Sequence, residues 1–255
     1  MNNKEVDDLK QKLETIKSNI QVDKDRTTKP NFLDLWKTPY LRNNTAIMSL
    51  NWFITVFVYY GVSFNLQGLG GNHFLTFFIA GLVEIPAIIL SMFVLKTFDR
   101  TSFLSASQIG MFLAFMCAAI VSIFNLKHKV MIVVVFVMFA KFFSTCAFAI
   151  NYILSGEMYP TVVRQIGVGT NSAAGRIGSM LSPFMKELNT KFHATASFSV
   201  FAMIALVDAI LVQFLPETRG KDIPDTIAQV EGKQNDIKMN KISNNKKTSN
   251  EKNVT

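Results

Sequence analysis

Residues 130–153 read VMIVVVFVMFAKFFSTCAFAINYI, an apolar run in which Lys141 is the single charged side chain. An α-helix needs roughly 20 mostly apolar residues to cross the hydrocarbon core of a bilayer. A membrane barrel strand needs only about 10 residues of alternating polarity. The length of this run therefore indicates a membrane-spanning helix.

Five further runs have the same character and are separated by short polar stretches. The composition agrees, since 49% of the chain is apolar and only 17% is charged, against about 25% charged in soluble domains. The sequence predicts an all-α membrane protein with six transmembrane helices. These predicted spans lie at about 45–65, 74–95, 102–124, 130–153, 165–186 and 194–215.

The net charge of +8 is concentrated in the tails and does not form one basic face, so nucleic acid is not an expected partner. Lys and Arg side chains collect on the cytoplasmic side of membrane proteins. Twenty of the 26 lie in the two tails and in the loops on the same side of the membrane, and four lie in the opposite loops. Both tails are therefore expected in the cytoplasm.

Three regions follow from this pattern. Residues 1–43 form a cytoplasmic N-terminal segment, in which apolar side chains three and four apart predict an amphipathic helix at 5–20. Residues 44–216 form the six-span bundle. Residues 217–255 form a cytoplasmic tail, and its Asn- and Lys-rich part after about 232 is predicted to be disordered.

Four ionisable side chains lie inside the predicted spans, where each needs a partner or a water-filled cavity. Glu84, Lys141 and Arg176 fall near mid-bilayer, and Asp208 lies nearer the cytoplasmic end. Glu84 and Lys141 could form a bridge that only joins helices, or they could belong to a polar centre that binds a substrate. Arg176 lies among small residues before Pro183, and a permanent cation there would attract an anionic group.

Trp52 and Tyr59 are seven residues apart and so share one face of the first span. Aromatic side chains in a span usually pack against other helices or face lipid. They could also form an aromatic wall that binds an organic ion, with cation–π contact. The sequence leaves both interpretations open.

Motifs of enzymes are absent from the chain: it has no H-E-x-x-H, no Gly-rich phosphate loop and no Ser/His/Asp set. Cys117 and Cys146 lie within apolar runs and predict no disulfide. His73, His128 and His193 are scattered at or near external loops. We therefore expect neither catalysis nor a metal or other cofactor.

Several motifs together resemble a known family. These are KTFDR at 96–100, EMYPTVVR at 157–164 and PETRG at 216–220, with FLDLWKTP at 32–39 and LVEIPA at 82–87. They resemble the second half of a major facilitator transporter. More closely, they resemble the organic cation/anion/carnitine transporter family (solute carrier family 22), including its invertebrate organic cation transporters.

The resemblance implies roles for individual residues. The position of Lys141 is commonly basic in this family. The position of Arg176 is Asp in several mammalian cation transporters but Arg in anion and carnitine carriers, and Ile88 stands where anion exchangers often carry Lys. This pattern favours a zwitterion or weak anion. The candidate substrate-binding residues are Arg176, Lys141, Trp52, Tyr59, Phe148 and Glu84.

The resemblance also implies a cytoplasmic gate made of Asp99, Arg100, Glu157 and Arg164. Asp99 is expected to cap a helix start while pairing with a basic neighbour, and Glu157 is expected to reach Arg164 across a Pro-containing turn. Such pairs would be intact when that side is closed and broken when it opens. The family usually continues Asp-Arg with Gly and further basic residues, whereas Thr-Ser-Phe follows here at 101–103, which predicts a weaker gate.

Members of this family have twelve spans and hold the substrate between two six-helix halves. The chain is therefore expected to supply the C-terminal half of a carrier that moves small organic ions across the plasma membrane by alternating access. Its expected partners are the lipid bilayer, the ion and an N-terminal half. Two alternatives remain: a truncated half that regulates or associates with full-length carriers, and a homo-oligomeric channel or half-carrier that supplies both halves by self-association.

Overall fold

The chain folds into a bundle of long helices. The computed structural model describes residues 12–14, 17, 32–66, 73–124, 128–191 and 194–220, and the regular structure in these ranges is helical. This confirms the predicted all-α class. The helices are α2 (Asp34–Lys37), α3 (Pro39–Leu66), α4 (His73–Thr97), α5 (Arg100–Ile123), α6 (Lys129–Met158), α7 (Arg164–Leu181), α8 (Phe184–Lys191) and α9 (Ala194–Val212).

Two predicted segments fall largely beyond this description. Of the amphipathic helix expected at 5–20, residues 12–14 and 17 are described, and they are helical. The tail after about 232 lies outside the described residues.

Five of the described helices, α3, α4, α5, α6 and α9, are long and apolar enough to cross a membrane. They correspond to five of the six predicted spans. Large apolar side chains on their outer faces suit contact with hydrocarbon rather than water. On α4, for example, Phe74 is 87% exposed, Phe93 65% and Met92 64%.

The sixth predicted span, at 165–186, differs from the others. α7 ends at Leu181, and α8 begins at Phe184 after a turn that contains Pro183. Proline lacks the backbone N–H that would continue the helix. Because α7 contains Asn171, Arg176 and several glycines, it does not meet the criterion of length and apolarity that the other five satisfy.

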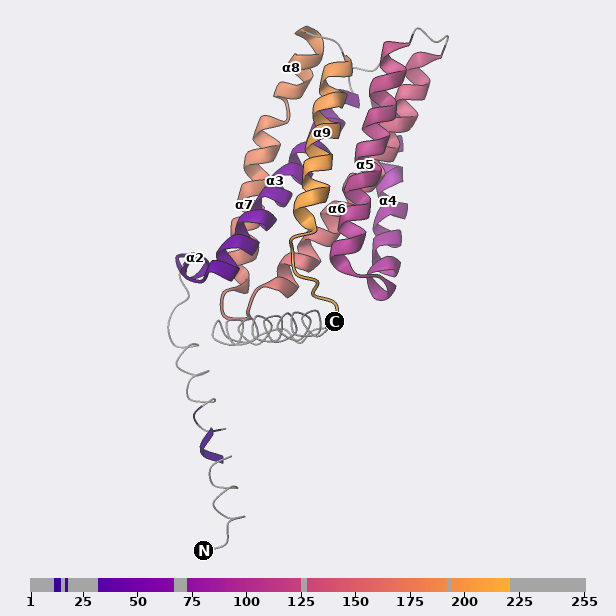
Figure 1. Ribbon diagram of the computed structural model, residues 1–255. Helices are drawn as coiled ribbons and strands as arrows, with labels where there is room; N and C mark the ends of the chain where they lie inside the picture. Colours follow the sequence, from indigo (N-terminus) through magenta and orange to yellow (C-terminus); the bar gives the residue numbers. More distant parts are fainter. Residues whose placement is uncertain are drawn as a thin grey trace, which may run out of the picture.

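α3 and α6 occupy the middle of the bundle (Figure 1). α5 packs against α6 and α9, and α9 also packs against α3. α4 packs against α6 and α7 against α3, so that α4 and α7 flank the central pair on opposite sides (Figure 1). α2 and the residues that follow α9 lie at one end of the bundle, which we call the tail end.

The close packing of α7 on α3 depends on small residues along one face of α7. A Cβ at Gly175 would lie 3.0 Å from Val56 of α3, whereas Gly167 makes room for the ring of Tyr159, which follows α6. At Gly178 a Cβ would collide with the backbone carbonyl of Phe53. Backbone cannot yield as a flexible side chain can, so Gly178 sets the distance between the two helices.

We predict that Gly178→Ala lowers the stability of the chain by about 1–3 kcal/mol because it forces α3 and α7 apart. Gly169→Ala is the matched control, since its Cβ would meet nothing within 4 Å and alanine favours the helix. Thermal unfolding of the detergent-purified chain, followed by Trp fluorescence, measures both. Equal melting temperatures for the two variants would contradict the packing argument.

Candidate functional site

Lys141 in α6 carries a buried charge that is fully paired. Its side chain is 3% exposed, and its ammonium lies 2.9 Å from Glu84 Oε1 in α4. It also donates to Ser63 Oγ at 3.0 Å and lies 3.2 Å from the centroid of the Tyr59 ring, both in α3. An ammonium has three N–H donors, so these contacts engage the whole group and join α3, α4 and α6.

Glu84 is only partly satisfied by the bundle. Its Oε1 accepts from Lys141 and also from the Tyr59 hydroxyl at 2.7 Å. No described residue donates to its Oε2, and the side chain is 28% exposed. One carboxylate oxygen is therefore free to accept a bond from outside the bundle.

A group of aromatic rings extends from this ion pair along α3 and α6. The Phe148 ring centroid lies 5.5 Å from that of Tyr59 and 6.0 Å from that of Trp52. Tyr152 packs 4.6 Å from Trp52 and 5.4 Å from Phe148, and it is 49% exposed. Tyr152 is not among the predicted binding residues, although its position four residues after Phe148 places both on one helix face.

Trp52 lies behind this group rather than at its surface. It is 1% exposed, and its indole N–H donates to Ser155 Oγ at 2.8 Å. Its ring lies 3.4 Å from the place that a Cβ on Gly175 would take. Trp52 therefore supports Phe148 and Tyr152 and does not itself line an open surface.

Arg176 lies apart from the ion pair. It is exposed on α7, and its guanidinium makes no hydrogen bond or ion pair with the described residues. The structure thus brings five of the six candidate binding residues together and leaves Arg176 on the opposite flank of the α3–α6 pair.

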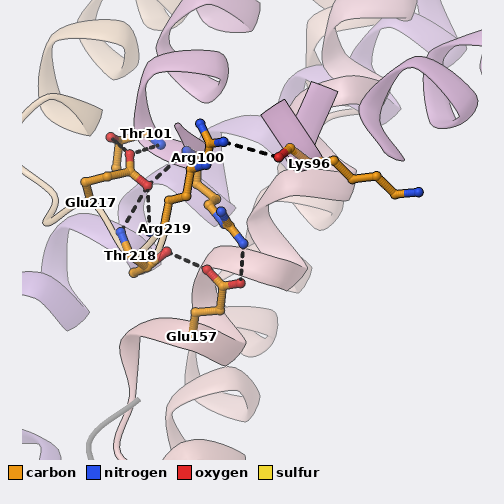
Figure 2. A network of polar contacts seen from close by, with 7 residues as sticks. All are labelled: Lys96, Arg100, Thr101, Glu157, Glu217, Thr218 and Arg219. Carbon is orange, nitrogen blue, oxygen red and sulfur yellow. Dashed lines mark hydrogen bonds and ion pairs between the residues drawn. The ribbon is translucent and has the colours of Figure 1, made fainter. Parts of the chain in front are cut away.

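A second polar group lies at the tail end, where Glu217 caps the start of α5 (Figure 2). The backbone N–H groups of Arg100 and Thr101 donate to its carboxylate at 3.0 and 2.9 Å, and the Thr101 hydroxyl donates as well. The first N–H groups of a helix lack internal acceptors, and the helix dipole favours a negative charge there.

The same short segment also holds the ends of α4 and α6. Arg219 donates to the carbonyl of Thr97. It also donates to the carbonyl of Lys96, at 3.2 Å (Figure 2). Glu157, near the end of α6, accepts from Arg100 Nη2 at 2.9 Å and from the Thr218 hydroxyl at 2.5 Å. Residues 217–219 therefore clamp three helix ends together.

Two expected gate contacts are not formed. Glu157 was expected to pair with Arg164, but its two oxygens bind Arg100 and Thr218, while Arg164 Nε and Nη2 have no partner among the described residues. Asp99 precedes α5 but makes no side-chain cap, because Glu217 occupies that position. The expected basic neighbour of Asp99 is Arg219, 3.7 Å away.

Comparison with known proteins shows the family of this chain. The sequence profile of the sugar (and other) transporter family matches residues 1–226. The chain belongs to that family, within the major facilitator superfamily. Its relatives are transporters and not enzymes, and with its apolar helices this makes the chain an integral membrane protein.

Similar proteins confirm the resemblance to solute carrier family 22. The organic cation transporter protein of Drosophila melanogaster is 34% identical over 194 residues, which cover 76% of this chain and 34% of the relative. The human organic cation/carnitine transporter 2 is 36% identical over 202 residues, which cover 78% of this chain and 35% of the relative. Human solute carrier family 22 member 13 is 33% identical over 201 residues, which cover 79% of this chain and 36% of the relative.

The chain spans about a third of the length of these relatives. Among solved structures, the inward-open xylose transporter XylE of E. coli aligns with a TM-score of 0.56 at 15% identity, covering 69% of this chain and 40% of that one. This likeness shows the transporter fold.

We predict that the Lys141–Glu84 pair is energetically coupled. Lys141→Met should be strongly destabilising while Glu84 is present, because it leaves a carboxylate without its cation, and much less so in the background of Glu84→Gln. A double-mutant cycle on thermal unfolding should give a coupling energy of about 1–3 kcal/mol. Additive single effects would show that the pair contributes nothing.

The pH dependence of stability tests the Glu217 cap. Partial burial raises the pKa of this carboxyl, but hydrogen bonds from Thr101 and from the backbone amides of Arg219, Thr101 and Arg100 outweigh it, so its pKa lies below 4.5. A lowered folded pKa stabilises the protein above the ordinary value, and this contribution is lost as the pH falls through the folded value.

Glu217→Gln should therefore lower the melting temperature at pH 7, and the difference from the unmodified chain should shrink in acid. Asp99→Asn is the control, because Asp99 is 55% exposed and only 3.7 Å from Arg219. A Glu217→Gln deficit that is the same at pH 7 and in acid would contradict the assignment.

Proposed function

We propose that this chain forms the C-terminal six-helix half of a carrier for small organic ions, with both tails in the cytoplasm and the plasma membrane as its location. The family match and the share of the relatives that the chain covers support this arrangement. In this proposal α7 and α8 together make the sixth crossing. An N-terminal half would face α4 and α7 and close the cavity.

The observation that carries the proposal is the half-satisfied carboxylate of Glu84. Lys141 engages its three donors within the bundle and pairs with Glu84 Oε1, but it leaves Oε2 open. Exposed rings of Tyr60 and Tyr152 lie close to this site through their contacts with Tyr59 and Phe148. A carboxylate bordered by aromatic faces binds an organic cation by charge and by cation–π attraction.

Arg176 supplies the opposite sign. Its guanidinium is permanently charged, exposed, and on the helix that flanks the central pair on the side away from Glu84. A substrate with a cationic group toward Glu84 and an anionic group toward Arg176 satisfies both. We therefore favour a zwitterion such as carnitine, in keeping with the name of the human relative, organic cation/carnitine transporter 2.

The tail-end contacts suit a gate in this mechanism. Arg100–Glu157, Thr218–Glu157 and the Glu217 cap hold α5 and α6 together, and Arg219 adds the end of α4. Alternating access requires such contacts to form when the cytoplasmic side closes and to separate when it opens. Residues 216–220 are thus proposed to act as the cytoplasmic latch of this half.

Transport tests the proposal directly. We would join the chain to the N-terminal half of the Drosophila organic cation transporter and measure uptake of carnitine, of a simple organic cation and of an organic anion. Glu84→Gln should lower uptake of carnitine and of the cation by about tenfold, since one charge-assisted contact is worth about 1.5–3 kcal/mol. Arg176→Asp should lower uptake of carnitine and the anion and spare the cation.

Lys186→Asp makes the same charge change at an exposed position in α8 and serves as the control. Unchanged selectivity in Arg176→Asp would remove it from the binding site. If the joined carrier moves none of the three solutes, but the chain alone alters uptake by a co-expressed full-length relative, the regulatory alternative would replace transport.

A further inference from the structure

A cluster of buried polar side chains lies away from the proposed substrate site, between the two hydrophobic clusters of the bundle. It contains Asn51 and Thr55 of α3, Gln108 of α5, Asn151 of α6 and Asp208 of α9, each with no exposed surface. None of them shares a hydrogen bond with Glu84 or Lys141. The cluster is therefore a hydrogen-bond network separate from that ion pair.

The amide N–H groups of the cluster are directed at two acceptors. Asn51 Nδ2 and Gln108 Nε2 donate to Asp208 Oδ2 at 2.8 and 2.5 Å. Gln108 Nε2 and Asn151 Nδ2 donate to Thr55 Oγ1 at 3.2 and 3.1 Å. These contacts fix all five side chains at one depth in the bundle.

Four oxygen atoms of the same cluster have no hydrogen-bond partner among the described residues: Asp208 Oδ1, Asn51 Oδ1, Gln108 Oε1 and Asn151 Oδ1. The oxygen and nitrogen of an amide are about 2.2 Å apart. The free oxygens of Asn51 and Gln108 therefore lie within about 5 Å of the Asp208 carboxylate. The contacts between described residues thus leave four oxygens of the cluster without a donor.

Asp208 also lacks a countercharge. The ion pairs between described residues involve Glu84, Asp99 and Glu157, and none involves Asp208. A buried carboxylate with no cation is strongly unfavourable in an apolar interior. Both the free oxygens and the charge call for a positive ligand that binds oxygen.

We propose that this cluster binds one monovalent alkali cation, with Asp208 Oδ1 and amide oxygens of Asn51, Gln108 and Asn151 as ligands. Oxygen ligands suit hard cations. One carboxylate balances one positive charge, whereas a divalent ion would leave a net charge in the apolar bundle. Bound there, the cation joins α3, α5, α6 and α9 and stabilises the fold.

The chain itself, purified in detergent, allows the test. Its melting temperature is measured at fixed pH and ionic strength while N-methyl-D-glucamine chloride is replaced by NaCl or by KCl. We expect one of the alkali cations to raise the melting temperature saturably, by roughly 5 °C. The sodium and potassium arms show which ion the cluster prefers.

Asp208→Asn should abolish this shift while keeping the shape of the side chain. Glu84→Gln, which removes a different acid from the bundle, should retain the shift. If neither salt stabilises the chain more than N-methyl-D-glucamine chloride does, or if Asp208→Asn still responds, the proposal is overturned. A melting temperature that depends on pH but not on the salt would likewise overturn it, because a proton and not a metal cation would then neutralise Asp208.

A direct measurement covers the case in which Asp208→Asn does not fold. Equilibrium binding of radioactive sodium to the unmodified chain, with potassium as competitor, should reach about one ion per chain. A lack of saturable binding by either ion would refute the site, independently of whether the chain transports any solute.

Discussion

The ion pair between the Lys141 ammonium and Glu84 Oε1 joins α4 to α6, and the contacts of both side chains with α3 complete the proposed binding site. A lone charge at the centre of a spanning helix costs about 2.5–3.5 kcal/mol on insertion scales, so Lys141 requires a partner. Glu84 on α4, together with the Ser63 hydroxyl and the Tyr59 ring on α3, meets that need. Because Lys141 is fully engaged, Glu84 is the member of the pair that remains open to a ligand.

The same two helices connect this site to the tail end. α4 carries Glu84 and ends at Thr97, whose carbonyl accepts from Arg219. α6 carries Lys141 and, near its last turn, Glu157, which binds Arg100 and Thr218. A shift of either helix at the ion pair would thus also displace its contacts with residues 217–219. The proposed gate is therefore physically linked to the proposed site.

The sequence predicted what depends on composition and could not predict what depends on distant partners. The run at 130–153 lies within α6, and the Glu84–Lys141 bridge was one of the two stated alternatives. α3 begins at Pro39, before the predicted 45, because a polar first turn is helical without being hydrophobic. The partners of Asp208 and Glu157, and the burial of Trp52, come from helices far along the chain, and no local pattern encodes them.

The proposed function requires a water-accessible face between α4 and α7 and contact with lipid at α5 and α9. Cysteine accessibility measures this directly, in the carrier completed by an N-terminal half and with Cys117 and Cys146 replaced. Single cysteines at Tyr152 and Arg176 should react with a water-soluble thiol reagent, while those at Met203 and Val207, exposed on α9, should not. Equal reactivity at the four positions would contradict the account.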